Sequence, residues 1–262
     1  MRATPLRTMS HRPSDIPTRY PKLAVLLAAG LGRRLAPHTW RTPKSLLRFG
    51  GFPILSYVFN ALLNTRIRHV VVVTHHLEDQ IASYLTGRLA NRFHVRFCHQ
   101  PVLDGTAGAL SCAAGIIQKE NTDPFLVSAT DYCMPPDYLK ALIQYHCNGP
   151  QDASIGLRTV SATQACRSNL ATVGEGDKID AIAEKPSRVA GVGPYLAAYL
   201  LYIVPVRILD YLNDLQRTIR GEFELPDAIH HMIQDKMDVR GCLGQAFIEW
   251  ERQYGQGQAT RI

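Results

Sequence analysis

The sequence predicts an α/β protein in which a mixed, mainly parallel sheet is flanked by helices. Two observations lead to this prediction. Apolar, β-branched runs alternate with segments of helical period over most of the first 150 residues, which is typical of strand–helix–strand units. The first of these runs, residues 23–28, ends in a glycine-rich turn at Gly30 and Gly32. Turns of this kind bind ligands at the carboxyl edge of parallel sheets.

Each expected element follows from its own local pattern. Runs rich in β-branched and other apolar residues predict strands at residues 23–28, 69–74, 95–98, 124–129, 153–157, 179–183 and 195–203. Helical spacing of apolar residues predicts helices at residues 54–64, 77–89, 106–118 and 136–147. From about residue 150 the expected strands are shorter and no helix separates them. We therefore expect one domain, residues 23–262, with two halves at about 23–150 and 151–262.

The positive charge of the chain is concentrated at its beginning. The net charge is +7, and residues 1–22 carry +4 of it because four arginines and one lysine face a single aspartate. A nucleic-acid surface is therefore not needed to explain the charge, and a site for anionic phosphates explains the remainder equally well. Residues 1–22 also contain four prolines and no apolar periodicity, which predicts a flexible basic tail.

Composition also bears on the compartment. No apolar run is long enough to span a membrane, so we expect no membrane partner. The six cysteines are widely spaced and form no C-x-x-C pair, which favours reduced thiols in a cytoplasmic protein. The sequence leaves the oligomeric state open and is compatible with a homo-oligomer.

The segment from residue 26 to residue 47 has the composition of a phosphate-binding loop. Glycines at 30 and 32 let backbone N–H groups approach an anion, while Arg34 and Lys44 add positive charge. A dinucleotide fingerprint would need a third glycine where this chain has Leu35, and no Walker A string is present. The alternative is an ordinary glycine-rich turn with scattered surface charge.

The remaining pattern resembles a known family. Gly-x-Gly-x-Arg-Leu, followed by Pro-x-Thr and Pro-Lys, is similar to the start of sugar-1-phosphate nucleotidyltransferases, glucose-1-phosphate thymidylyltransferases in particular. The resemblance implies a Rossmann-like nucleotide-diphospho-sugar transferase fold, with the nucleotide in the first half and the acceptor in the second. It implies catalytic roles for Arg34 and Lys44 and nucleotide binding by Leu27, Ala29, Gly30 and Gly32. Arg33 departs from the Ser or Thr usual in the family.

A second loop, HQPVLDGTAGAL at residues 99–110, is expected to meet the base. Gln100 can offer a donor and an acceptor, and the small residues around Gly105 and Thr106 allow close approach of a flat ring. The string resembles the thymidylyltransferase segment that reads a pyrimidine, which favours dTTP or UTP. Its Gly-Thr-Ala-Gly portion is closer to guanylyltransferases, so GTP stays open. The alternative is a small-residue helix start that only packs closely.

Two acids are expected to bind Mg²⁺. Asp131 ends an apolar strand, where a carboxylate faces the ligand crevice, and hard oxygen ligands suit Mg²⁺. RGEFELPD, residues 220–227, resembles the family segment that supplies the second metal ligand and an acceptor contact, which implies those roles for Asp227 and Arg220. The alternatives are a helix N-cap at Asp131 and a plain capped helix start after residue 224.

The tripeptide Glu184-Lys185-Pro186 resembles the acceptor motif of the same family. That resemblance implies that Glu184 binds sugar hydroxyls and that Lys185 holds the acceptor phosphate, whereas a solvated turn is the alternative. Together the motifs predict Mg²⁺-dependent transfer of a nucleotidyl group from a nucleoside triphosphate to a sugar-1-phosphate. Two other functions stay open: transfer to a non-sugar phosphate or phosphonate such as phosphocholine, and a non-catalytic nucleotide-binding role.

Overall fold

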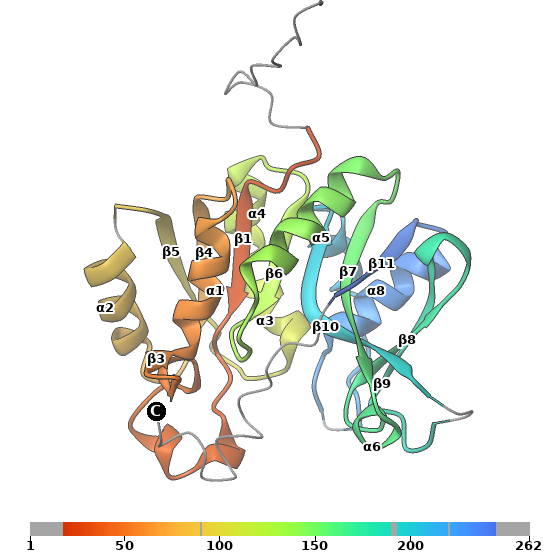
Figure 1. Cartoon of the computed structure of the whole chain (residues 1–262). Helices are drawn as coiled ribbons and strands as arrows, with labels where there is room; N and C mark the ends of the chain where they lie inside the picture. The colour runs from red at the N-terminus through yellow and green to blue at the C-terminus, as the bar shows by residue number, and fades with distance from the viewer. Residues whose placement is uncertain (1–17, 90, 190–192, 220, 245–262) are drawn as a thin grey trace, which may run out of the picture.

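The computed structural model describes residues 18–89, 91–189, 193–219 and 221–244, and in these ranges it contains a mixed sheet of nine strands (Figure 1). Seven strands lie side by side in the order β11 (Val239–Leu243), β7 (Ala153–Val160), β10 (Tyr195–Val204), β6 (Phe125–Ala129), β1 (Leu23–Leu27), β4 (His69–Thr74) and β5 (His94–His99). β8 (Asn169–Val173) pairs with β10, and β9 (Ile179–Glu184) pairs with β8. The predicted α/β class is therefore confirmed.

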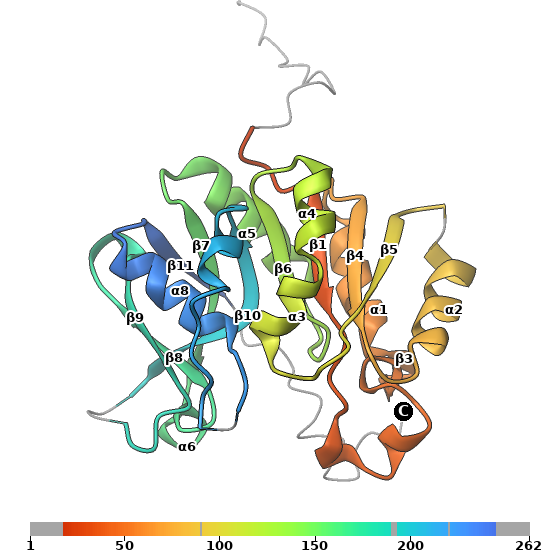
Figure 2. The same cartoon turned by 180° about the vertical axis from the view of Figure 1, so that it is seen from behind.

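β1 shows why the first half of the sheet is parallel and covered on both faces. Leu23 and Val25 belong to one apolar core, whereas Ala24 and Leu26 belong to a second core on the other face. A strand buried on both faces needs a continuous apolar sequence, and LAVLL supplies it. One core is closed by α3 (Thr106–Cys112), α4 (Ala114–Glu120) and α8 (Leu225–Gln234); the other is closed by α1 (Ile54–Leu63), α2 (Glu78–Leu89) and α5 (Pro136–Asn148) (Figures 1 and 2).

All seven expected strands are present, with ends shifted by a few residues, but three expectations were wrong. The helix expected at 106–118 is divided by a turn at Ala113 into α3 and α4. β7 and β10 have 8 and 10 residues, so the second half does not have shorter strands. β10 is long because it pairs with β7 from Tyr195 to Ile203 and also pairs with β8 near its start and with β6 near its end. The third wrong expectation concerns helices in the second half. No helix was expected between its strands, but α8 lies between β10 and β11.

Several short elements complete the described chain. They are the strands β2 (Arg48–Phe49) and β3 (Phe52–Pro53), the helices α6 (Ala162–Ala165) and α7 (Ile208–Tyr211), and the 3-10 turns η1 (Arg33–Leu35), η2 (His38–Trp40), η3 (Lys44–Leu46) and η4 (Glu175–Asp177). All six cysteines are free thiols, as the sequence predicts. Within the described ranges, no helix combines the length and the apolar character needed to cross a bilayer.

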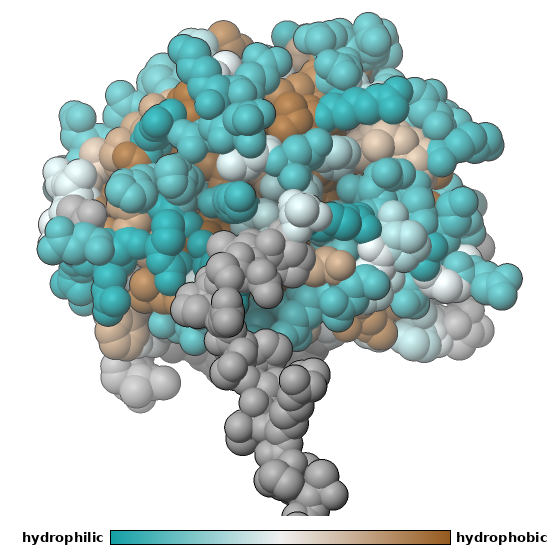
Figure 3. Space-filling model, turned by 90° about the horizontal axis from the view of Figure 1, so that it is seen from above, coloured by the Kyte–Doolittle hydropathy of each residue, from teal (hydrophilic) through white to brown (hydrophobic). Residues whose placement is uncertain are grey.

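The strand order places a ligand crevice beside β1. β1 pairs in parallel with β4 on one side and with β6 on the other, and Leu27 lies opposite Ala129. Loops that leave the carboxyl ends of such strands separate at this point and leave space between them. The loop after β1, the start of β8 and the end of β9 lie at this end of the molecule (Figure 1). The opposite end, seen in Figure 3, exposes mainly hydrophilic side chains with scattered apolar patches.

The expected tail meets the domain at its last residues. Residues 1–17 lie outside the described ranges, but the Arg19 guanidinium donates hydrogen bonds to the carbonyls of Gly149 and Gln151. The Tyr20 hydroxyl accepts a hydrogen bond from the Arg66 backbone N–H at 2.8 Å. The segment around Arg19 and Tyr20 is therefore part of the packed structure.

His146 gives the fold a defined dependence on pH. It is 1% exposed, its Nδ1 lies 2.9 Å from the Ser154 hydroxyl, and burial together with the charge of Arg19 lowers its pKa from 6.5 to about 4. Between pH 4 and pH 6.5 the unfolded chain therefore binds more protons than the folded chain. The contribution of His146 to the free energy of unfolding is fully present above pH 6.5 and is lost as the pH falls towards 4.

We expect the free energy of unfolding to fall by up to about 3 kcal/mol over this window through His146 alone. Urea denaturation of wild type and of His146→Gln between pH 4 and 7 measures it, because glutamine does not titrate. The difference in unfolding free energy between wild type and His146→Gln should change with pH over this window. A difference that is constant with pH contradicts the prediction.

Candidate active site

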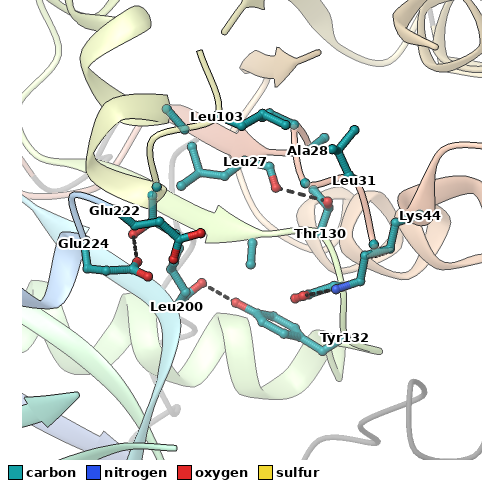
Figure 4. A pocket seen from close by; sticks show the side chains of 18 of the residues that line it. Leu27, Ala28, Leu31, Lys44, Leu103, Thr130, Tyr132, Leu200, Glu222 and Glu224 are labelled. Carbon is teal, nitrogen blue, oxygen red and sulfur yellow. Dashed lines mark hydrogen bonds and ion pairs between the residues drawn. The ribbon is translucent and has the colours of Figure 1, made fainter. Parts of the chain in front are cut away.

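A cavity of about 1040 Å³ opens at the carboxyl ends of β1 and β6. Its walls come from the loop after β1, the loop before α3, the segment after β6, the turns around β8 and β9, and the segment before α8. These parts are far apart in the sequence, and Figure 4 shows their side chains converging on one space. A volume of this size is at the upper end of the range of small-molecule pockets.

The loop after β1 is shaped by its second glycine. Gly32 has a φ of +61°, and a Cβ on it would lie 2.9 Å from Thr39 Cγ2. Its carbonyl accepts hydrogen bonds from the Leu35 N–H at 2.8 Å and the Thr39 hydroxyl at 3.1 Å. Gly30 differs, because a Cβ there would meet no protein atom within 4 Å. Both glycines line the cavity, and the space beside Gly30 is available to a ligand.

Lys44 and Asp131 form an ion pair across the cavity floor. Lys44 Nζ lies 2.7 Å from Asp131 Oδ2, and the side chains are 16% and 39% exposed. Burial raises the pKa of the Asp131 carboxyl, but the charge and hydrogen bond of Lys44 and the charge of Arg34 outweigh it, so the pKa is lowered. Asp131 is not a helix cap, because the N-cap of α5 is Pro135. A lysine and an ionised acid beside a glycine turn suit a phosphate–metal complex.

Gln100 lines the cavity and is held in one orientation. It is 2% exposed, its backbone N–H donates to Thr74 O at 2.8 Å, and its carbonyl lies 2.7 Å from His75 Nδ1. Its side-chain Nε2 donates to Asp104 Oδ1 at 3.0 Å and to Gly105 O at 3.2 Å. Both amide protons are therefore used inside the loop. The expectation that Gln100 offers a donor as well as an acceptor was wrong, since only Oε1 is left for a ligand.

The loop before α3 is joined to the segment before α8. Phe223 N–H donates to Asp104 O at 2.6 Å, and Ala107 N–H donates to Phe223 O at 3.0 Å. The Thr106 hydroxyl donates to Glu224 Oε2 at 2.7 Å and accepts from Leu225 N–H at 2.8 Å. We call this set of contacts the 104–107/223–225 junction. It holds Glu224 beside the loop before α3.

The second expected metal ligand does not line the cavity. Asp227 lies in the first turn of α8, half-buried, and burial followed by the charge of Glu224 raises its pKa. Glu222 and Glu224 line the cavity instead, on the opposite side from Lys44 (Figure 4). Both glutamates belong to the same RGEFELPD string, from which sequence reasoning took only the arginine and the aspartate. The metal role of Asp227 stays a prediction.

The acceptor motif is only partly in the cavity. Lys185 lines it, with a φ of +38°, whereas Glu184 does not line it and pairs with Lys185 Nζ at 3.2 Å. Arg220 lies outside the described residues. Arg158, Arg167 and Asn169 also line the cavity, although sequence reasoning did not select them. Arg158 is a single cation within a strand, and no local pattern marks such a residue as functional.

Most of the predicted site is thus brought together. The predicted residues that line the cavity are Leu27, Ala29, Gly30, Gly32, Arg34, Lys44, Gln100, Gly105, Thr106, Asp131 and Lys185. The sequence model of the nucleotidyl transferase family matches residues 23–251, a range that includes all of them. The chain belongs to this family.

Individual relatives agree with this membership. The chain is 30% identical over 220 residues to the mannose-1-phosphate guanylyltransferase catalytic subunit beta of Drosophila melanogaster, which covers 83% of this chain and 57% of that protein. The chain thus spans about half the length of the curated relatives it matches.

Solved structures show the same fold. A UDP-glucose pyrophosphorylase complexed with UDP-glucose superimposes with a TM-score of 0.79 at 17% identity, covering 91% of this chain and 97% of that one. A putative glucose-1-phosphate thymidylyltransferase from Bacillus anthracis gives a TM-score of 0.74 at 21% identity, with coverages of 92% and 97%. The expected nucleotide-diphospho-sugar transferase fold is therefore confirmed.

We expect Gly105→Ala to disrupt the 104–107/223–225 junction. Gly105 has a φ of +110°, and a Cβ on it would lie 2.2 Å from the Phe223 carbonyl oxygen. The variant should lose more than about 2 kcal/mol of unfolding free energy in urea denaturation. Gly115→Ala is the matched control, because a Cβ at Gly115 meets nothing within 4 Å in α4, and it should be neutral or stabilising. Equal stability of the two variants contradicts the prediction.

Proposed function

We propose that this protein transfers a nucleotidyl group from a nucleoside triphosphate to a sugar-1-phosphate, giving a nucleoside diphosphate sugar and pyrophosphate. One observation carries the proposal: a single cavity contains the glycine turn, the Lys44–Asp131 pair and Lys185, which come from three separate parts of the chain. Membership of the nucleotidyl transferase family supports the reaction type. One matched protein is named a mannose-1-phosphate guanylyltransferase and one matched structure a UDP-glucose pyrophosphorylase. These names support a sugar phosphate as the substrate class.

The reaction needs alignment and charge neutralisation more than it needs a protein nucleophile. An oxygen of the acceptor phosphate attacks the α-phosphorus, a new P–O bond forms, and the bond to the leaving pyrophosphate breaks in line with it. Arg34 and Lys44 would stabilise negative charge on the phosphates, and the backbone around Gly30 and Gly32 would hold them. Lys185 would orient the acceptor phosphate from the other side of the cavity.

The residues present fit Mg²⁺ as the cofactor. No set of three or more His, Cys, Asp or Glu side chains in the described part of the chain could hold a metal alone. Mg²⁺ in nucleotide sites is typically bound by one or two carboxylates together with phosphate oxygens and water, so this arrangement suits it. Asp131 would be the first carboxylate, with Glu222 or Glu224 across the cavity and Asp227 behind them. When bound, the ion would neutralise triphosphate charge.

The orientation of Gln100 supports a base whose Watson–Crick ring nitrogen carries a proton. Because Nε2 is held by Asp104 and Gly105, Gln100 would accept through Oε1. Uracil and thymine offer N3–H, and guanine offers N1–H, whereas the corresponding ring nitrogens of cytosine and adenine are acceptors. We therefore propose dTTP or UTP as the preferred nucleotide, with GTP next. A cytoplasmic location and a homo-oligomer stay predictions of the sequence.

Lys44→Ala and Asp131→Asn should each lower turnover by on the order of a hundredfold or more, because each removes a charge beside the reacting phosphates. Pyrophosphate release with Mg²⁺ and a panel of nucleotides and sugar phosphates measures this effect. Lys140→Ala, an exposed change on α5, is the control and should keep wild-type turnover. Near-normal turnover of either active-site variant would contradict the proposed roles of Lys44 and Asp131 in nucleotidyl transfer.

Asp104→Ala should weaken the choice of base. Without the Asp104 carboxylate the Gln100 amide can rotate and present its N–H groups, which pair with acceptors on cytosine or adenine. We expect the ratio of kcat/KM for UTP to that for CTP to fall by roughly tenfold. Asp79→Ala on the outer helix α2 is the control. If Asp104→Ala lowers kcat/KM for UTP and for CTP equally, Asp104 only supports the loop and does not set the choice of base.

A further inference from the structure

Asn169, the first residue of β8, carries a side-chain amide that the rest of the described protein does not use. Its Oδ1 is buried and has no hydrogen-bond partner, and its Nδ2 forms no hydrogen bond to another described residue. Buried polar atoms of side chains are paired in the large majority of cases, because an unpaired one costs free energy. Asn169 also lines the cavity. An unpaired amide at a cavity wall indicates a group whose partner is a ligand.

The backbone at Asn169 is held on both sides by the sheet. Asn169 lies opposite Ala198 of β10 and opposite Glu184 of β9. The preceding residue, Ser168, is fixed as well, because its carbonyl accepts a hydrogen bond from the Lys185 backbone N–H at 3.2 Å. The position of the Asn169 Cβ is therefore set by the strands, and only the amide group can change its partners.

The residue across the sheet leaves space for a ligand beside this amide. Side chains of directly opposed residues in an antiparallel pair lie on the same face, and Ala198 lines the cavity together with Asn169. Ala198 has only a methyl group there. Rotation about the last torsion of the Asn169 side chain exchanges Oδ1 and Nδ2, and it breaks no hydrogen bond to a described residue. Gln100 differs, because Asp104 and Gly105 hold its Nε2.

An unpaired amide oxygen selects among acceptors by its chemistry. It needs a hydroxyl or an N–H group on the ligand, and a sugar ring offers several hydroxyls. The trimethylammonium group of phosphocholine offers no donor, and proteins bind such groups with exposed aromatic faces. Among the described residues that line the cavity, the aromatic ones are Tyr132 and Tyr199, which are 6% and 5% exposed. Arg158 also lies over the Tyr199 ring. The lining therefore favours a hydroxylated acceptor.

We propose that Asn169 accepts a hydrogen bond from one ring hydroxyl of the acceptor and is a specificity-determining residue for the reaction. This inference rests on the proposed function, in which Lys185 orients the acceptor phosphate. Lys185 directly follows Glu184, the residue of β9 that lies opposite Asn169, so a sugar ring attached to that phosphate lies within reach of the amide. The acceptor class is a hexose 1-phosphate with a free hydroxyl at the ring position that faces Asn169.

The test removes the hydroxyl and the amide separately and together. Pyrophosphate release is measured with the best nucleotide, Mg²⁺ and the better of glucose 1-phosphate and mannose 1-phosphate, and then with each monodeoxy analogue of that sugar phosphate. We expect one analogue to lower kcat/KM of wild type by at least about tenfold and that of Asn169→Leu by less than about threefold. The other analogues should affect both proteins alike. Equal effects on both proteins for every analogue overturn the proposal.

A second variant separates recognition from folding. Asn169→Asp keeps an acceptor oxygen in nearly the same volume, so it should retain the dependence on the same hydroxyl that Asn169→Leu loses. Neither variant removes a hydrogen bond to a described residue, so the thermal shift produced by the nucleotide should be unchanged in both. Asn60→Leu, an exposed change on α1, is the control and should keep wild-type kcat/KM for every acceptor. Loss of the dependence in Asn169→Asp as well contradicts an acceptor role for Oδ1.

The remaining outcomes distinguish this inference from the proposed function. If a hexose 1-phosphate releases pyrophosphate but no hydroxyl depends on Asn169, the inference fails while the proposed function stands. If the nucleotide binds but only phosphocholine, or no acceptor at all, releases pyrophosphate, the proposed function fails and this inference with it.

Discussion

The cavity depends on the parallel pairing of β1 with β4 on one side and β6 on the other. This pairing places Leu27 opposite Ala129, so the chain leaves both strands at the same edge and turns away in different directions. The Thr130 hydroxyl, which donates to the Leu27 carbonyl at 3.2 Å, links the two exits. Because of this register the glycine turn and Asp131 lie close together although a hundred positions separate them, and Lys44 can reach Asp131.

The second requirement is that the two halves of the domain stay in contact at the site. β10 joins them in the sheet, since it pairs with β6 and with β7. The 104–107/223–225 junction joins them again at the cavity, through backbone hydrogen bonds and the Thr106–Glu224 contact. One loop thus brings Gln100 to the cavity and also holds Glu224 through Thr106. A change in either segment is transmitted to the other through hydrogen bonds with fixed geometry.

The charges around the cavity are separated into groups with different tasks. Lys44 and Arg34 lie beside the glycine turn and keep Asp131 ionised. Glu222 and Glu224 lie on the opposite side of the cavity, and burial followed by the charge of Glu224 raises the pKa of Asp227. Arg158 and Lys185 line another part of the cavity, where Arg158 stacks on Tyr199 and Lys185 pairs with Glu184. Attack on a triphosphate by a second phosphate brings like charges together, and a site with several cations around a few acids reduces that repulsion.

The sequence by itself determined the α/β class, the strands of the first half and most of the cavity lining that the first half supplies. These features follow from local rules: period and β-branching for strands, and glycine with nearby cations for an anion loop. Only the tertiary structure decided which acids line the cavity. Glu222, Glu224 and Asp227 lie within six residues of each other, but Glu222 and Glu224 precede α8 and line the cavity, whereas Asp227 lies inside the helix and does not. It also decided that the amide protons of Gln100 are bound within the loop, by Asp104 and the Gly105 carbonyl, so that only Oε1 is left for a ligand. Sequence reasoning did not select Arg158, because its place in the cavity wall depends on Tyr199 in β10 and on Ser168 just before β8, and contacts between segments distant in the chain leave no local pattern.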